Sequence, residues 1–160
     1  MDEEEKARFM NLFPFEVQGY DLIGYKVVYH SLEKIPLDGD TQIKEMSKQE
    51  FESTVKTLIR PYLQEKNQQG ITIFLDCRGM SIPKALKFQP FGVRYFEIME
   101  NMFPFLPIRV VVYDLPPWML PLFLLSIPKR WKKNVLAVSE KEPSKIETWM
   151  GKEWMQENKI

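Results

Sequence analysis

The chain has 160 residues, enough for one domain with a buried core of its own. Its 44% hydrophobic and 13% aromatic residues exclude the composition of a disordered chain. The 22 basic and 22 acidic side chains cancel, so no overall charge attracts nucleic acid or an anionic membrane. We therefore predict a single domain over residues 1–160 and no nucleic-acid partner.

Cys77 is the only cysteine, which excludes an internal disulfide and a thiolate metal site and favours a reducing compartment. The N-terminal sequence MDEEEKARF lacks the apolar core of a signal peptide. The longest uncharged run, residues 115–128, is shorter than the ~20 apolar residues of a membrane-spanning helix. We expect a cytoplasmic protein.

The beginning of the chain predicts a helix, a turn and a strand. Residues 3–13 place Phe9, Leu12 and Phe13 on one side of a short helix. Residues 19–24 begin and end with glycine and predict a turn. The β-branched and aromatic residues that follow predict a strand over residues 25–29.

A second helix is predicted to begin at Ser47. Ser47 and Glu50 have the spacing of a capping box, in which the two side chains accept hydrogen bonds from backbone N–H groups of the first turn. Apolar residues then keep helical spacing as far as Leu63. Pro61 removes a backbone donor inside this pattern, so we expect a break or kink near Thr57.

The remaining chain alternates strands and helices. Short apolar runs predict strands at 71–75 and 108–113, and a last strand is predicted at 134–138. Amphipathic patterns predict a helix at 91–102 and a closing helix after Pro143. The connections are too long for hairpins, so we predict an α/β fold, a mostly parallel mixed β-sheet with helices packed on it.

Candidate catalytic residues are few. Asp76 and Asp114 end two predicted strands, where they could hold magnesium, act as acid and base, or cap the turns that follow. Cys77 and the single histidine, His30, lack the partners of a nucleophilic site. Because the phosphate-binding glycine motifs are also missing, we predict no enzyme activity, metal or cofactor.

The most unusual segment is YDLPPWMLPLFLLSIPKRW, residues 113–131. It has no charge between Asp114 and Lys129, and it contains four prolines. Basic residues then surround Trp131. Periodicity alone also fits a helix that is buried on all sides, in the core or against a partner.

Five motifs follow one another along the chain. They are the Asp-x-x-Gly-x-x-Val pattern within residues 19–28, the glycine-initiated strand 70–76, the linker 78–90, the helix end Phe103-Pro104 and the strand and proline turn 110–116. Their order resembles the lipid-binding domain of the CRAL-TRIO, or Sec14-like, family, and the resemblance covers roughly residues 18–155. The turn of Asp-x-Pro type is similar to the motile-sperm-domain-containing members, although the family more often has Asn near the position of Asp114.

The resemblance implies a CRAL-TRIO-like domain without the usual N-terminal three-helix segment. In that family the segment that follows the proline turn, here Pro116, is a mobile helical gate over an apolar pocket. The implied function is non-catalytic binding or transfer of a phospholipid or other lipid, in a pocket closed by residues 115–131. Transient membrane docking through the gate would place the protein in the cytoplasm and peripherally on membranes.

Under this hypothesis, apolar side chains of the sheet, the helix at 91–102 and the gate line the lipid pocket. They are Phe74, Tyr95, Met99, Val110, Val112, Trp118, Met119, Leu122, Phe123, Leu125 and Ile127. The predicted headgroup or membrane-surface residues are Lys129, Arg130, Trp131 and Lys133. Members that transfer phosphatidylinositol carry Glu at the position of Phe105 and Lys at that of Lys133, so this chain matches one of the two.

Two other functions stay open. The same fold with a filled pocket could be a protein-interaction or membrane-recruitment module, comparable to family domains that bind small-GTPase regulators. Alternatively, residues 74–79 followed by Ser81 resemble the strand and phosphorylated turn of anti-sigma-factor antagonists.

Overall fold

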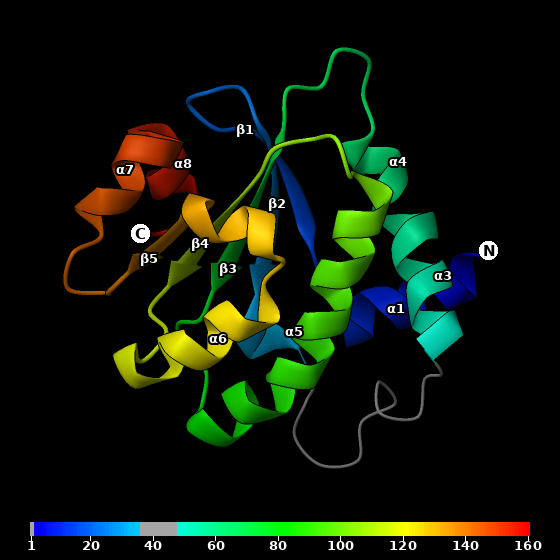
Figure 1. The fold of residues 1–160 in the computed structure, drawn as a ribbon, viewed down its shortest axis with the longest axis horizontal. Helices are drawn as coiled ribbons and strands as arrows, with labels where there is room; N and C mark the ends of the chain where they lie inside the picture. Colours follow the sequence, from blue (N-terminus) through cyan, green and yellow to red (C-terminus); the bar gives the residue numbers. More distant parts are fainter. Residues whose placement is uncertain (1, 36–47) are drawn as a thin grey trace.

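A five-stranded sheet forms the centre of the computed structural model, which describes residues 2–35 and 48–160 (Figure 1). The strand order is β1-β2-β3-β4-β5. The first pair is antiparallel and the other pairs are parallel, which confirms the predicted α/β fold with a mostly parallel mixed sheet. The strands are β1 (Glu16–Tyr20), β2 (Lys26–Ser31), β3 (Ile71–Asp76), β4 (Ile108–Tyr113) and β5 (Val135–Val138).

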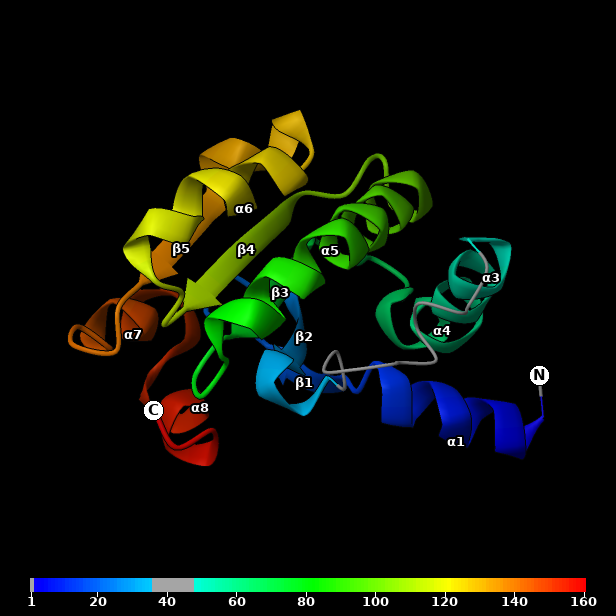
Figure 2. The ribbon, with the colours of Figure 1, turned by 90° about the horizontal axis from the view of Figure 1, so that it is seen from below.

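Helices cover both faces of the sheet. Figure 2 shows α5 and α6 on one side of the strands and α8 on the other. One hydrophobic cluster joins the sheet to α1 (Glu3–Leu12), α3 (Lys48–Leu58), α4 (Arg60–Leu63), α5 (Ile82–Met102), α6 (Leu120–Ser126) and the 3-10 turns η1 (Leu32–Lys34) and η3 (Lys129–Asn134). A second cluster joins the opposite face to α7 (Ser144–Met150) and α8 (Lys152–Glu157). The 3-10 turn η2 (Pro117–Met119) precedes α6.

The two clusters follow from the pleat of the strands, which sends successive side chains to opposite faces. Val28, Ile73 and Val110 are register partners and face the cluster that contains α5. Phe74 and Val111, the next partners along the same strands, face α7 and α8. The central strands are therefore buried on both sides, as their continuous apolar runs predicted.

Two predicted boundaries are confirmed. The strand predicted at 108–113 is β4, and the helix break expected near Thr57 occurs where α3 ends at Leu58 and α4 begins at Arg60. The proposed cap at Ser47 lies outside the described residues. The edge strand β1 and the last helix α8 were not predicted.

The linker expected at residues 78–90 is wrong, because α5 begins at Ile82. The Ser81 hydroxyl accepts a hydrogen bond from the Lys84 N–H at 3.3 Å, and Pro83 occupies a first-turn position where no donor is needed. Pro90 lies inside this helix and leaves the carbonyl of the half-exposed Leu86 without its usual partner.

The carboxylate of Asp21, in the Asp-x-x-Gly-x-x-Val pattern, connects the turn between β1 and β2 to strands β3 and β4. Its Oδ1 accepts hydrogen bonds from the N–H groups of Ile23 and Tyr25, at 3.1 and 2.9 Å. Its Oδ2 accepts from the Thr72 hydroxyl on β3 and from Arg109 on β4, the latter at 2.7 Å. The motif therefore has a structural role, in which one carboxylate connects β3 and β4 to the turn before β2.

His30 is fully buried at the junction of α1, β2 and α5. Its Nε2 lies 2.8 Å from the Tyr95 hydroxyl, and its ring stacks on Phe13 with centroids 4.7 Å apart. Burial lowers the pKa of His30 to about 4, because the charged imidazolium would lose its hydration, while the nearby Pro14 carbonyl acts in the opposite direction. The side chain is therefore neutral near pH 7 and has a structural role.

We predict that the free energy of unfolding decreases as the pH falls from 6.5 toward about 4, because the unfolded chain binds a proton that buried His30 does not. The loss should reach roughly 2 kcal/mol near pH 5. Denaturant titrations near pH 7 and pH 5 measure it, with His30→Gln as the non-titrating control. Equal pH dependence in the two proteins would contradict the assignment, since the chain has no other histidine.

Candidate functional site

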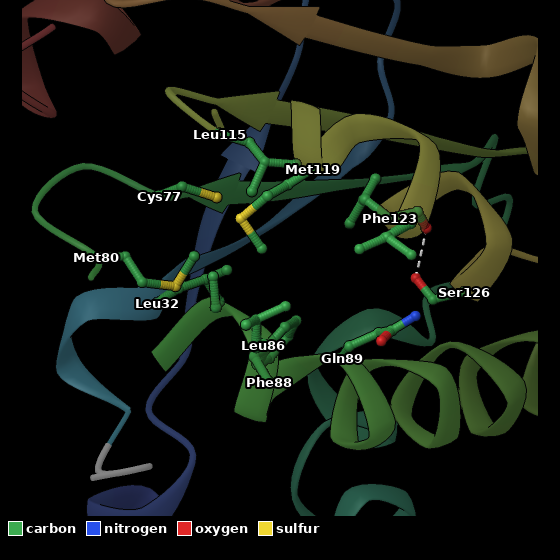
Figure 3. Close-up of a pocket in the computed structure, with 12 residues that line it drawn as sticks. Leu32, Cys77, Met80, Leu86, Phe88, Gln89, Leu115, Met119, Phe123 and Ser126 are labelled. Atoms are coloured by element: carbon green, nitrogen blue, oxygen red, sulfur yellow. Dashed lines mark hydrogen bonds between the residues drawn. The ribbon is translucent and has the colours of Figure 1, made fainter. Parts of the chain in front are cut away.

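An apolar cavity of about 30 Å³ lies between α5 and residues 115–126 (Figure 3). It is surrounded by residues of α5, of the segment from Leu115 to Ser126, and of the turns that follow β2 and β3. They are Leu32, Cys77, Met80, Ala85, Leu86, Phe88, Gln89, Leu115, Met119, Leu122, Phe123 and Ser126. The Ser126 hydroxyl donates to the Phe123 carbonyl at 2.6 Å, so it is already paired. Because water needs polar partners, a cavity of this kind should be dry.

Residues 115–128, which we call the flap, are attached to the sheet and to α5 by apolar contacts. Across the described chain, the flap is hydrogen-bonded to a residue outside it only at its last residue, where the Trp131 N–H donates to the Pro128 carbonyl at 3.0 Å. Its polar groups pair internally, as when the Met119 N–H donates to the Pro116 carbonyl at 2.9 Å. The contacts to α5 are apolar, including an edge-on pair of the Phe96 and Phe123 rings with centroids 6.0 Å apart. Moving the flap outward would break no polar interaction with the sheet or with α5 in the described chain.

The end of the flap is fixed by Glu100 on α5. The Trp131 indole N–H donates to this carboxylate at 2.6 Å, and the Arg130 Nε donates to both of its oxygens at 2.7 and 2.8 Å. Arg130 also donates to the carbonyls of Phe103 and Leu106. The turn after the flap is therefore anchored by charge-assisted hydrogen bonds, which are stronger than neutral ones.

The predicted membrane-surface position of Trp131 is wrong. Its side chain is fully buried and packs edge-on against Phe96, with ring centroids 5.8 Å apart. The reason is Glu100, which supplies the acceptor that a buried indole N–H needs. Arg130 belongs to the same network, so of the four predicted surface residues only Lys129 and Lys133 are exposed without a recorded ion pair in the described chain.

The other end of the flap follows β4 at Asp114. This residue has a φ of 64°, in the left-handed region that Asp tolerates better than most residues. Its N–H donates to the Val138 carbonyl of β5 at 2.8 Å, which fixes the backbone directly before the flap. The flap therefore lies between two well-held points.

The structure separates the predicted pocket residues. Met119, Leu122 and Phe123 line the cavity. Tyr95, Met99, Val110, Val112 and Ile127 are buried in the core on the same face of the sheet but do not line it. Trp118 in η2 and Leu125 on α6 are exposed, at 55% and 73% of their surface.

Phe74 is the clearest correction among these residues. It lies on the opposite face of the sheet, where its ring centroid is 4.6 Å from that of Trp154 on α8. The error arose because Phe74 is one residue out of phase with Val110 and Val112 in the pleat.

The cavity residues that sequence reasoning missed come mainly from the start of α5. Met80, Ala85 and Phe88 fell in the stretch assigned to a linker. A signal was present, since Ser81 followed by Pro83 is a typical helix start and Ala85, Phe88 and the next turns keep helical spacing.

The strand-end residues have structural roles. Asp76 accepts hydrogen bonds from the Tyr29 hydroxyl at 2.5 Å and from the Arg78 guanidinium and N–H at 2.7 and 3.1 Å. Arg78 in turn donates to the carbonyls of Asn158 and Lys159, which holds the end of the chain. Burial, with a smaller contribution from Asp76 and Asp114, raises the pKa of the Cys77 thiol and makes it a poor nucleophile.

A scan of protein-family models gives no match to the chain, and a search of curated proteins gives no significant match. In residues 2–35 and 48–160, no group of three or more His, Cys, Asp or Glu side chains is placed to hold a metal ion. Within the same residues, no helix has the length and apolarity to cross a bilayer.

We predict that Glu100→Ala lowers the free energy of unfolding by roughly 2 kcal/mol, because it leaves the buried Trp131 N–H without an acceptor and Arg130 without its carboxylate. Glu97→Ala is the matched control, since Glu97 is exposed on the same helix. It should cost less than about 0.5 kcal/mol. Equal effects of the two variants in denaturant titrations would exclude a role for Glu100 in fixing the flap.

Proposed function

We propose that this chain binds a lipid or another hydrophobic molecule, without catalysis, in a pocket that opens when the flap moves away from α5. One observation carries the proposal: an apolar cavity is covered by a segment that, in the described chain, has no polar interaction with the sheet or with α5. Such a cover can exchange its apolar contacts with α5 for apolar contacts with a ligand.

The order of motifs supports the same proposal. In the CRAL-TRIO family, which the sequence resembles, the gate follows a strand and a proline turn and covers an apolar pocket. Here the flap follows β4 and Pro116 and covers the cavity against α5. We propose a CRAL-TRIO-like domain, cytoplasmic and peripheral on membranes, with a lipid as its ligand.

The cavity would have to enlarge when a ligand binds. About 30 Å³ holds no more than a few atoms, whereas pockets for small molecules enclose roughly 300–1,000 Å³. The structure corresponds on this proposal to the closed form, in which Met119, Leu122 and Phe123 occupy space that acyl chains would take. Each buried methylene of a ligand would contribute about 0.8 kcal/mol toward displacing them.

The small cavity also favours a second candidate, a protein-interaction module with a filled pocket. The exposed apolar side chains Trp118 and Leu125 on the flap and Leu86 on α5 would then contact a protein, such as a small-GTPase regulator. This candidate differs from the first in requiring no opening of the flap.

We predict that the purified protein retains lipid, detected by native mass spectrometry and by organic extraction. Ala85→Phe should abolish retention, because a bulky ring at this cavity-lining position occupies the space that the ligand needs. Lys87→Phe, at an exposed position of the same helix, introduces the same ring away from the cavity and should leave retention unchanged.

A folded wild-type protein that never retains lipid, even after incubation with vesicles, would contradict the first candidate and favour the second. In that case Trp118→Ala together with Leu125→Ala should weaken binding to a protein partner, because these are the exposed apolar side chains of the flap. Thermal unfolding of each variant provides the test that the fold is intact.

A further inference from the structure

Phe105 is the most exposed of the large apolar side chains in the described residues, at 96% of its surface. It lies in the loop that joins α5 to β4, between Pro104 and Pro107. Each proline fixes one backbone dihedral, and Arg130 donates hydrogen bonds to the carbonyls of Phe103 and Leu106 at 2.9 and 2.7 Å. The loop backbone is therefore fixed while the Phe105 ring stands in solvent.

Three lysines lie in the turn that contacts this loop. Lys129, Lys132 and Lys133 of η3 are exposed, and the described residues provide none of them with an ion pair. The loop precedes β4 and η3 precedes β5, so both lie at the amino edge of these parallel strands. The hydrogen bonds from Arg130 hold the two against each other.

This edge is continuous with the flap. In Figure 2 the loop between α5 and β4, the turn that follows α6, and α6 itself lie along one side of the molecule. Trp118 directly before α6 and Leu125 near its end are exposed. An extended surface that met this side could contact Phe105, the lysines and the flap together.

We propose that Phe105 and the lysines Lys129, Lys132 and Lys133 form a docking site for an anionic membrane surface. The lysines match the negative charge of lipid headgroups, and the projecting ring matches the apolar boundary directly beneath them. A fluid lipid layer accepts a single projecting ring without a preformed pocket, which a protein partner would have to supply. The site deepens the proposed function and rests on it, since it would bring the flap to the bilayer from which a ligand enters.

Vesicle co-sedimentation of the whole chain tests the site. The probes are vesicles of phosphatidylcholine alone and of phosphatidylcholine mixed with phosphatidylserine. Phe105→Ser should weaken binding to the mixed vesicles about tenfold, and Phe105→Trp should restore or strengthen it. Lys132→Gln with Lys133→Gln should weaken it about twentyfold, and only on vesicles that contain phosphatidylserine.

The charge-matched control is Lys141→Gln with Lys152→Gln, which removes the same charge near α7 and α8 on the other face of the sheet. It should leave vesicle binding unchanged. Because Phe105 and the lysines are exposed, none of these variants should alter thermal unfolding.

If the wild-type protein binds neither kind of vesicle, the membrane proposal is overturned. The surface would then fit an acidic protein partner instead. Vesicle binding that the control weakens as much as the double lysine variant would overturn it as well, because nonspecific charge would then explain the binding. Lipid retention by the same preparations is measured separately, so retained lipid with no effect of Phe105→Ser refutes the docking site and leaves the proposed function intact.

Discussion

The carboxylate of Glu100 fixes the point to which the chain must return after β4. Because β4 and β5 are parallel, the connection between them has to cross the full length of the sheet. Glu100 holds its end on α5 through Trp131 and Arg130, and the backbone at Asp114 holds its beginning beside β5. With both ends fixed, residues 115–128 can be apolar, have no polar interaction with the sheet or α5 in the described chain, and still cover a defined part of α5.

This arrangement connects stability to the proposed function. The core beneath the sheet is secured elsewhere, by His30 with Tyr95 and by Asp21 with Arg109, so opening the flap need not disturb it. Local opening free energies in proteins are lowest where buried apolar contacts are few and polar attachments are missing. The four prolines of the segment also restrict its backbone, which favours movement of the flap as a unit. On this proposal, the anchored turn at its end would be the hinge and, with Phe105, the membrane contact.

The sequence predicted those features that depend on neighbouring residues. The apolar runs of β3 and β4 and the break before Pro61 belong to this class. Prediction from the sequence failed for features that depend on residues distant in the chain. The burial of Trp131 depends on Glu100, thirty-one residues earlier, and nothing near Trp131 indicates this partner. The face occupied by Phe74 depends on strand register, which a strand buried on both sides does not reveal in its sequence. The start of α5 was missed for another reason, because the family resemblance assigned residues 78–90 to a linker although Ser81 is a valid helix start.

Hydrogen exchange under native conditions would show whether the flap opens as a unit while the rest of the fold stays intact. We expect the amides of α6 to exchange through an opening whose free energy is well below that of global unfolding. The amides of β3 and β4 should exchange only on global unfolding, and added lipid should change the protection of α6 without changing that of the strands. Equal opening free energies for α6 and β4, in the presence and absence of lipid, would contradict this expectation.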